Sequence, residues 1–322
     1  MKRSWWARSA SVFNLGEESG ILRTSIAVTV LISLFGIGFG LISGSFSVAF
    51  DGVYSLVDAS MSVLALVVVN LIASYTASTG ISRRLHERFT MGFWHLEPMV
   101  LGLNGVMLIG VSVYALINAV ASLLGEGRDL EFGWAIVYAA ITLPTCFGMA
   151  AIEARANRTI GSAFVHLDGR SWIMSGGITA ALLVAFCIGY AVQGTAWEWM
   201  SPYIDPAVLA LVSLILIPMP ISTVKQALAD IFLVTPPELK RHVDSVAQDF
   251  VEKLGFLTFR AYVARVGRAR EIELYFIVPE DAPVRSIVEW DKLRDEIGDA
   301  LGPDSADNWV TIVFTADPEW AE

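Results

Sequence analysis

The stretch TSIAVTVLISLFGIGFGLIS, residues 24–43, decides the class of fold. It holds no charged residue, and as a helix rising 1.5 Å per residue it matches a hydrocarbon layer of about 30 Å. Five further apolar runs follow, at about 47–77, 98–124, 132–152, 172–192 and 203–224. Of the 322 residues, 55% are hydrophobic and 17% charged, and the mean hydropathy is +0.59. The sequence therefore predicts an α-helical membrane protein with a six-transmembrane-helix bundle.

The basic residues predict the topology of these spans. They gather before the first span, between the second and third, and between the fourth and fifth: Lys2, Arg3, Arg8, Arg23, Arg83, Arg84, Arg88, Arg155 and Arg158. The opposite loops hold only Arg128. Lys and Arg favour the cytoplasmic side, so both termini are expected there. The polar lead before the first span ends in no A-x-A-like cleavage site, so this span is expected to be a helix rather than a removable signal.

A second domain is expected after Thr235-Pro236-Pro237, where the composition turns from apolar to charged. Residues 1–235 form the predicted transport domain, and residues 236–322 a small cytoplasmic domain. Helical apolar spacing and β-type alternation predict the order helix, strand, strand, helix, strand, at residues 237–255, 256–267, 270–280, 284–302 and 308–317. This order indicates a small α+β sandwich with both helices on one face of a sheet.

Charge and motif content exclude several functions. The net charge is −10, and residues 236–322 carry −8 of it, with 10 Lys and Arg against 18 Asp and Glu. An acidic tail argues against a nucleic-acid partner. Cys146 and Cys187 lie inside predicted spans and are expected to pack as small apolar residues. An enzyme is not expected, since there is no nucleophile paired with a base, no phosphate-cradling glycine loop and no HExxH.

Two aspartates in DGVYSLVDAS, residues 51–60, mark the second span as functional. Seven helical steps bring Asp58 back to within about 20° of Asp51, with Tyr54 and Ser55 between them on the same face. An ionisable group at the bilayer centre costs about 2.5–3.5 kcal/mol on insertion scales, so a divalent cation is the expected partner. The alternative for Asp51 is that it caps the second helix. Asp58 is too deep in the span for that role.

The fifth span offers a counterpart in FVHLDGRSWIMSGG, residues 164–177. Asp168 and Ser175 are again seven residues apart, and His166 is a weaker candidate ligand. The alternative is that residues 172–192 alone span the membrane and leave His166, Asp168 and Arg170 at the cytoplasmic interface. Elsewhere, Glu97 is expected to be a first-turn charge of the third span. Asn104 is expected to bond a neighbouring helix, and Pro218 and Pro220 to kink the sixth span.

Four stretches together resemble the cation diffusion facilitator family: SVAFDGVYSLVDASMSVLAL (47–66), FTMGFWHLEPM (89–99), SWIMSGG (171–177) and YIDPAVLALVSLILI (203–217). The tail of two helices and three strands is similar too, so the resemblance covers nearly the whole chain. It implies a homodimeric six-helix transporter that exchanges a divalent metal cation for protons and carries a ferredoxin-like cytoplasmic domain. It implies no permanently bound cofactor, since the metal is the transported substrate.

The resemblance also implies a transport site built from residue pairs four apart on the second and fifth helices. Those positions here are Tyr54 with Asp58, and Asp168 with Trp172. Tyr54 offers a weak oxygen ligand, whereas Trp172 has no lone pair for a metal. Asp51 matches an aspartate that many members carry just ahead of the site. The expected metal ligands are therefore Asp51, Asp58 and Asp168, with Tyr54, Ser175 and His166 as further candidates.

An oxygen-only ligand set favours manganese, iron(II), magnesium or calcium over zinc, with cobalt also to be tested. Similar cytoplasmic domains often bind zinc through histidines, whereas this one has only His242. Two rival functions remain open at this point: movement of protons or a monovalent cation on the remaining aspartates, and a non-transporting membrane scaffold or sensor. Trp172 separates them, because a tryptophan facing Asp58 excludes a compact four-ligand site, whereas one facing lipid does not.

Overall fold

The computed structural model describes residues 18–76, 89, 92–160, 163–303 and 308–321. The chain divides into two compact units, Met1–Leu64 with Asn104–Ser222, and Ala65–Leu103 with Thr223–Glu322. Helices α3 and α5 contribute to both units. The predicted domain boundary after Thr235 stays a prediction, and the basic residues of 2–8 and 83–88 used for the topology lie outside the described residues.

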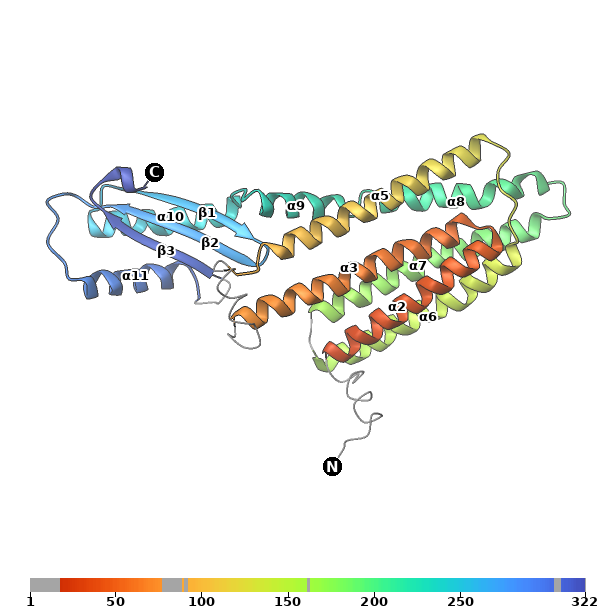
Figure 1. Cartoon of the computed structure of the whole chain (residues 1–322), viewed down its shortest axis with the longest axis horizontal. Coiled ribbons are helices and arrows are strands. Elements are labelled where there is room, and N and C mark those ends of the chain that lie inside the picture. The colour runs from red at the N-terminus through yellow and green to blue at the C-terminus, as the bar shows by residue number, and fades with distance from the viewer. Residues whose placement is uncertain (1–17, 77–88, 90–91, 161–162, 304–307, 322) are drawn as a thin grey trace, which may run out of the picture. The chain divides into compact units, whose positions relative to one another are not determined.

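Long apolar helices make up the first unit (Figure 1). They are α2 (Glu18–Ser43), α3 (Phe46–Thr76), α5 (Leu96–Leu124), α6 (Phe132–Ile160), α7 (Ala163–Val192) and α8 (Ser201–Leu216), which follows the short η1 (Glu198–Met200). Six segments are long and apolar enough to cross a membrane, and the prediction of six spans is confirmed. The fourth helix, however, extends to Ile160 rather than ending near residue 152, because its polar last turns remain packed against α7.

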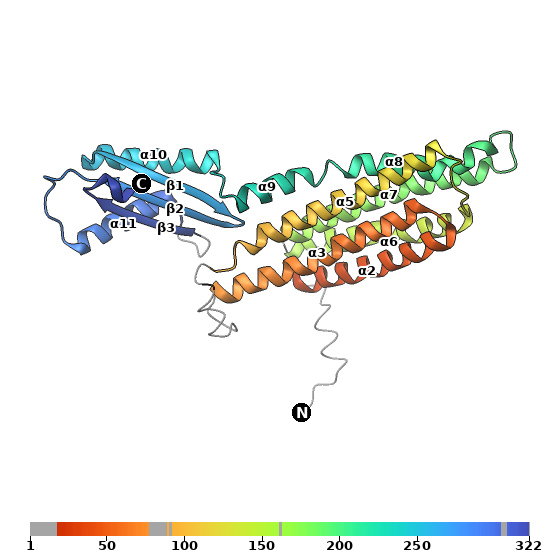
Figure 2. The ribbon, with the colours of Figure 1, turned by 45° about the horizontal axis from the view of Figure 1, so that its top comes forward.

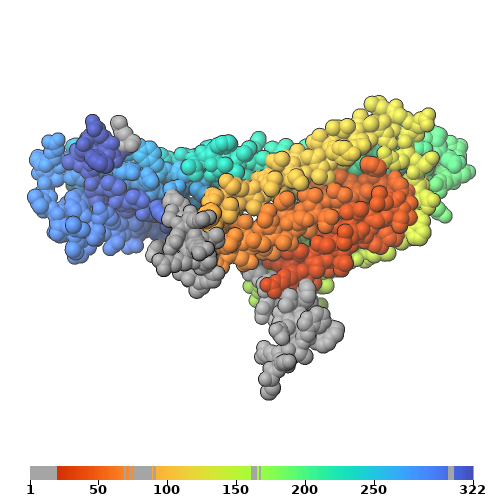
Figure 3. Space-filling model, in the orientation of Figure 1, coloured from red at the N-terminus to blue at the C-terminus, as the bar shows by residue number. Residues whose placement is uncertain are grey.

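Two clusters of buried side chains hold the first unit together. One joins α2, α3, α6 and α7 around Tyr138 and Phe186, and these four helices run side by side in both Figure 1 and Figure 2. The other joins α3, α5 and α8 around Phe50 and Leu209. Exposed large apolar residues lie along α5, among them Val106, Ile117 and Val120, and α5 forms part of the surface shown in Figure 3. Such an exterior suits lipid rather than water.

Glycines bring α2 and α3 into close contact. A Cβ atom on Gly40 would lie 2.5 Å from the backbone nitrogen of Ala49, and one on Gly52 would lie 2.7 Å from the carbonyl oxygen of Ser33. Neither position accepts a larger residue unless the two backbones separate. Small residues at such crossings let membrane helices approach closely and pack by van der Waals contact.

A carboxylate from α8 caps the start of α3. Asp205, which is 1% exposed, accepts hydrogen bonds from the Ser45 hydroxyl at 2.6 Å and from the amides of Phe46 at 3.1 Å and Ser47 at 3.4 Å. The first amides of a helix lack partners within it and carry a partial positive charge, so a carboxylate suits them. The alternative interpretation of Asp51 as this cap is therefore wrong, since α3 already begins at Phe46.

The sixth span is interrupted as the prolines predict. Helix α8 ends at Leu216, residues 217–220 form turns, and α9 runs over Ile221–Ile231. Pro218 and Pro220 have no amide hydrogen to continue the ladder. The predicted kink is confirmed, as a complete break between two helices.

The second unit contains the predicted αββαβ domain. Its elements are α10 (Pro237–Leu254), β1 (Thr258–Val266), β2 (Ala269–Ile277), α11 (Ile287–Leu301) and β3 (Asn308–Thr315), followed by η2 (Pro318–Ala321). Strand β2 is central, antiparallel to β1 and parallel to β3. Side chains of α10, α11 and one face of β2 enter a single core, so both helices cover the same face of the sheet (Figure 2). The predicted fold class is confirmed.

The turn between β1 and β2 forms ion pairs within the second unit. Arg268 donates to both carboxylate oxygens of Glu97 in the first turn of α5, from Nε at 2.9 Å and from an amino group at 3.2 Å. Arg265 lies 3.1 Å from Asp230 of α9. Glu97 is the predicted first-turn charge, and it also anchors this turn.

Candidate functional site

Asp58 lies in the middle of α3 among polar groups from two other helices. Its carboxylate accepts a hydrogen bond of 3.3 Å from the amide nitrogen of Asn104 on α5, so the prediction that Asn104 bonds a neighbouring helix is confirmed. The carboxyl group of Asp168 on α7 interacts with Asp58 electrostatically. Tyr54, one turn earlier on α3, also lies within electrostatic reach of Asp58. Tyr54 and Asp168 therefore each lie within electrostatic range of Asp58.

Asp168 has a second carboxyl neighbour, Glu153 on α6. Glu153 is 0% exposed, and one of its oxygens lies 3.3 Å from the position that a Cβ atom on Gly169 would take. The Ser25 hydroxyl and the Trp172 indole are also close to Glu153. None of these neighbours meets the geometry of a hydrogen bond to it within the described chain.

Several oxygen atoms at this place are buried without a hydrogen-bond partner among the described residues. They are both carboxylate oxygens of Glu153, one of Asp168 and the amide oxygen of Asn104. The other buried atoms without a partner are hydroxyls of serine and threonine, whose hydrogens rotate to suit their surroundings. Carboxylate oxygens only accept, so a buried one is satisfied by a proton or a cation.

Trp172 faces neither Asp58 nor lipid. Its ring is 6% exposed and packs with Cys146 and Met149 of α6 and Val28 of α2. Its indole N–H donates to the Ser25 hydroxyl at 2.8 Å. Trp172 therefore supplies no ligand, but it also does not separate Asp58 from Asp168.

The remaining candidates lie apart from Asp58 and Asp168. Asp51 accepts a hydrogen bond of 2.7 Å from the Tyr138 hydroxyl on α6. Ser175 is 3.8 Å from the Cys146 sulfur, and His166 is exposed near the start of α7. Asp168 lies inside the helix that begins at Ala163, in a segment apolar enough to span. Among the residues that the structure places, no three His, Cys, Asp or Glu side chains are grouped closely enough to hold a metal.

A family model describes most of this helical region. The model of the cation efflux transmembrane domain matches residues 22–232, from near the start of α2 to just past the end of α9. The chain belongs to the cation efflux family. No curated protein sequence matches the chain significantly. Membership makes this a multi-pass membrane protein and a transporter of metal cations, and the members of this family are transporters rather than enzymes.

In this family member, Glu153 is a buried acidic residue that the sequence patterns do not single out. It sits in AIEARANR, residues 151–158, where the arginines indicate a loop. The helical spacing from the buried Cys146, Met149 and Ala150 of α6 points to residue 153 as the next buried position. That spacing was the signal that could have found it.

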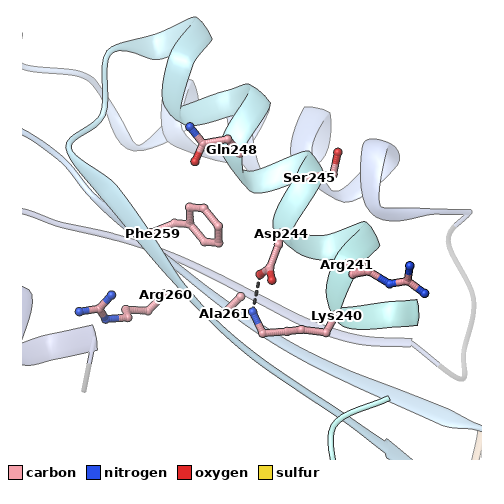
Figure 4. Close-up of a pocket in the computed structure, with 8 residues that line it drawn as sticks. All are labelled: Lys240, Arg241, Asp244, Ser245, Gln248, Phe259, Arg260 and Ala261. Carbon is pink, nitrogen blue, oxygen red and sulfur yellow. Dashed lines mark hydrogen bonds and ion pairs between the residues drawn. The ribbon is translucent and has the colours of Figure 1, made fainter. Parts of the chain in front are cut away.

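The αββαβ domain of the transporter has an open pocket between α10 and β1 (Figure 4). It is lined by Lys240, Arg241, Asp244, Ser245, Gln248, Phe259, Arg260 and Ala261. The Lys240 amine pairs with Asp244 one turn further along α10, so part of the charge that lines the pocket is already neutralised. The single histidine of the domain, His242, bonds the Leu301 carbonyl at 3.2 Å. Neither feature resembles a histidine-based metal site.

Proposed function

We propose that this protein exports a divalent metal cation in exchange for protons, by alternating access, from an oxygen-only site centred on Asp58 and Asp168. The observation that carries the proposal is the convergence of these two carboxyl groups from α3 and α7, beside the Asn104 amide. Family membership supplies the transport of metal cations. Opposing carboxylates attract a divalent cation when ionised, and their mutual repulsion favours a proton when the cation leaves.

The nature of the ligands supports a hard cation as the substrate. Carboxylate, amide and phenol oxygens suit manganese, iron(II), cobalt or magnesium, whereas zinc prefers nitrogen and sulfur ligands. Trp172, turned to Ser25, leaves this set of oxygens accessible to one another. Tyr54 and Asp51 belong to the proposed set as oxygens on the same helix as Asp58, with Ser175 as a more distant oxygen. His166, which offers only nitrogen, stays outside the oxygen set as a more distant candidate.

The proposed topology has both termini in the cytoplasm. The contact of Ser25 with Trp172 and of Glu153 with Asp168 places the start of α2, the end of α6 and the start of α7 at one end of the bundle. Arg23, Arg155, Arg158 and Arg170 lie at that end and are exposed. Such basic clusters favour the cytoplasmic face.

A homodimer is proposed from the family resemblance, and mass measurement of the protein in lipid nanodiscs tests it.

Counter-transport in proteoliposomes tests the function. Purified protein with an imposed pH gradient is given manganese, iron(II), cobalt, zinc or magnesium, with the Asp58→Asn variant in parallel and Asp129→Asn, an exposed loop aspartate, as the matched control. We expect flux of a hard cation together with proton movement, lost in Asp58→Asn and kept in Asp129→Asn. Absence of flux with every divalent cation in the folded wild type would contradict the proposal.

A second candidate function is transport of protons or a monovalent cation. The observation in its favour is that no three potential ligands are grouped within the described ranges of the chain. The same liposomes distinguish it, because flux of a monovalent cation or protons without any divalent cation then depends on Asp58.

A further inference from the structure

We propose that Glu153 of α6 is a ligand of the transported cation and forms, with Asp168 of α7, a two-carboxylate site next to Asp58. This inference rests on the proposed function and deepens it, since it adds a ligand from a helix outside the expected pair α3 and α7. Glu153 also compensates for two expected ligand positions, because Tyr54 is a weak oxygen ligand and Trp172 offers no lone pair.

The burial of Glu153 is the first argument. The side chain is 0% exposed, and neither carboxylate oxygen has a hydrogen-bond partner in the described part of the chain. An isolated buried carboxylate costs several kcal/mol. If Glu153 contributed only to packing, the protein would be more stable with an apolar side chain of the same size at this position. A cation bound during transport gives this carboxylate a use.

Among the described residues, no lysine or arginine of the protein pairs with Glu153. Arg155 and Arg158 follow on the same helix, but both are exposed, and Arg155 projects about 200° away around the helix. No ion pair joins Glu153 to a Lys or Arg in the part of the chain that the structure places. The negative charge is therefore available to a mobile cation.

The position of Asp168 is the second argument. One of its oxygens is also buried without a partner among the described atoms, and its carboxyl group interacts with both Glu153 and Asp58. Gly169 has no side chain to cover the Glu153 carboxylate, so the backbone of α7 approaches it closely. Three carboxylates thus follow one another from α6 through α7 to α3, with Asp168 in the middle.

A divalent cation fits between neighbouring members of this series. Two carboxylates neutralise its charge, and oxygen ligands at about 2.0–2.6 Å suit manganese, magnesium or calcium. Bound to Glu153 and Asp168, the cation lies towards the end of the bundle that carries Arg23 and Arg170. Asp58, further along the bundle, is the next ligand that it meets.

Equilibrium binding of Mn²⁺ to the full-length protein in detergent tests the inference. The test variant is Glu153→Gln. The matched control is Glu131→Gln, because Glu131 is an exposed glutamate just before α6. We expect Glu153→Gln to lower the Mn²⁺ affinity about ten-fold or more, as the loss of a metal-supporting group does. Glu131→Gln is expected to bind as the wild type does.

A second variant separates ligation from a structural role. Glu153→Cys offers a soft thiolate, so its preference is expected to shift from Mn²⁺ towards Cd²⁺ relative to the wild type. A residue that only shapes the helix would not change the order of metals. Unchanged Mn²⁺ affinity in Glu153→Gln, or an unchanged metal preference in Glu153→Cys, overturns the inference and leaves the proposed function standing. Failure of the wild type to bind any divalent cation overturns the proposed function itself.

Discussion

Two buried carboxylates of the first unit are treated in opposite ways. Asp205 is 1% exposed and accepts hydrogen bonds from Ser45, Phe46 and Ser47. Glu153 is 0% exposed and accepts none from the residues that the structure describes. The first carboxylate ties the start of α3 to α8, whereas the second contributes nothing visible to stability. The difference teaches that burial alone does not reveal the role of an acidic group in a membrane helix. The hydrogen-bond donors around the group reveal it.

The largest effect on this comparison is expected from Asp205→Ala. The change leaves the Ser45 hydroxyl and two amides of α3 without their acceptor, and hydrogen bonds to a charged group contribute about 1.5–3 kcal/mol each. We expect a loss of about 3 kcal/mol or more in the free energy of unfolding, measured by denaturant titration in detergent. A wild-type unfolding curve would show that Asp205 does not hold the two helices.

In the absence of metal, Glu153→Met is expected to raise the free energy of unfolding, whereas Asp205→Ala lowers it. An apolar side chain of similar size removes the cost of an unpartnered buried carboxyl group, which is about 1–3 kcal/mol. The same unfolding titration measures this gain, and adding Mn²⁺ should stabilise the wild type but not the variant. A variant less stable than the metal-free wild type would mean that Glu153 has a structural partner after all.

A smaller loss is expected for Trp172→Phe. The change keeps the ring in its packing cluster but removes the indole N–H that donates to Ser25. One neutral hydrogen bond contributes about 1 kcal/mol. The Mn²⁺ affinity should fall far less than in Glu153→Gln, because Trp172 supplies no lone pair. An equal fall in both variants would assign Trp172 a direct part in the site.

The smallest effect on stability is expected at Glu289, an exposed carboxylate that accepts hydrogen bonds. Glu289 accepts from the backbone amide of Ser286 at 2.6 Å and from its hydroxyl at 2.9 Å. These bonds, led by the backbone one, hold the pKa of the Glu289 carboxyl below its usual value. Because the pKa is lower in the folded state, the stabilisation is present above the unfolded value near 4.3 and is lost as the pH falls through the folded value.

Hydrogen exchange of the first turn of α11 measures this small contribution. Glu289→Gln should exchange faster than the wild type at pH 7, and the difference should narrow below about pH 4. Glu280→Gln serves as the control, as a glutamate in the loop before the helix. A difference that stays constant with pH would exclude the charge of Glu289 as its cause.

The sequence predicts the fold well where local patterns dominate. Apolar length specifies the six spans. In the αββαβ domain, β-type alternation specifies the order of the elements and Gly255 specifies the end of the first helix. Asp58 and Asp168 are predicted as a pair on two helices, and the structure brings them together. Their burial in apolar segments is a signal that one sequence is enough to reveal.

The rest depends on contacts between distant segments. The extent of α6 past residue 152, and with it the burial of Glu153, is set by packing against α7 rather than by hydropathy. The rotation of Trp172 towards Ser25 depends on α2, which lies far away in the sequence. Asp205 has a proline neighbour and an apolar surrounding in the sequence, and nothing there predicts that it caps α3.

The close fit of Gly40 and Gly52 against the neighbouring helix determines what moves when the transporter works. With the backbones of α2 and α3 separated by no side chain at these points, the two helices cannot slide past each other without a steric collision. Helix α3, which carries Asp58, is therefore expected to move together with α2. Under the proposed alternating access, a movement of α3 that changes the access to Asp58 also moves α2 and the lipid around it, so bilayer thickness and fluidity are expected to affect the transport rate.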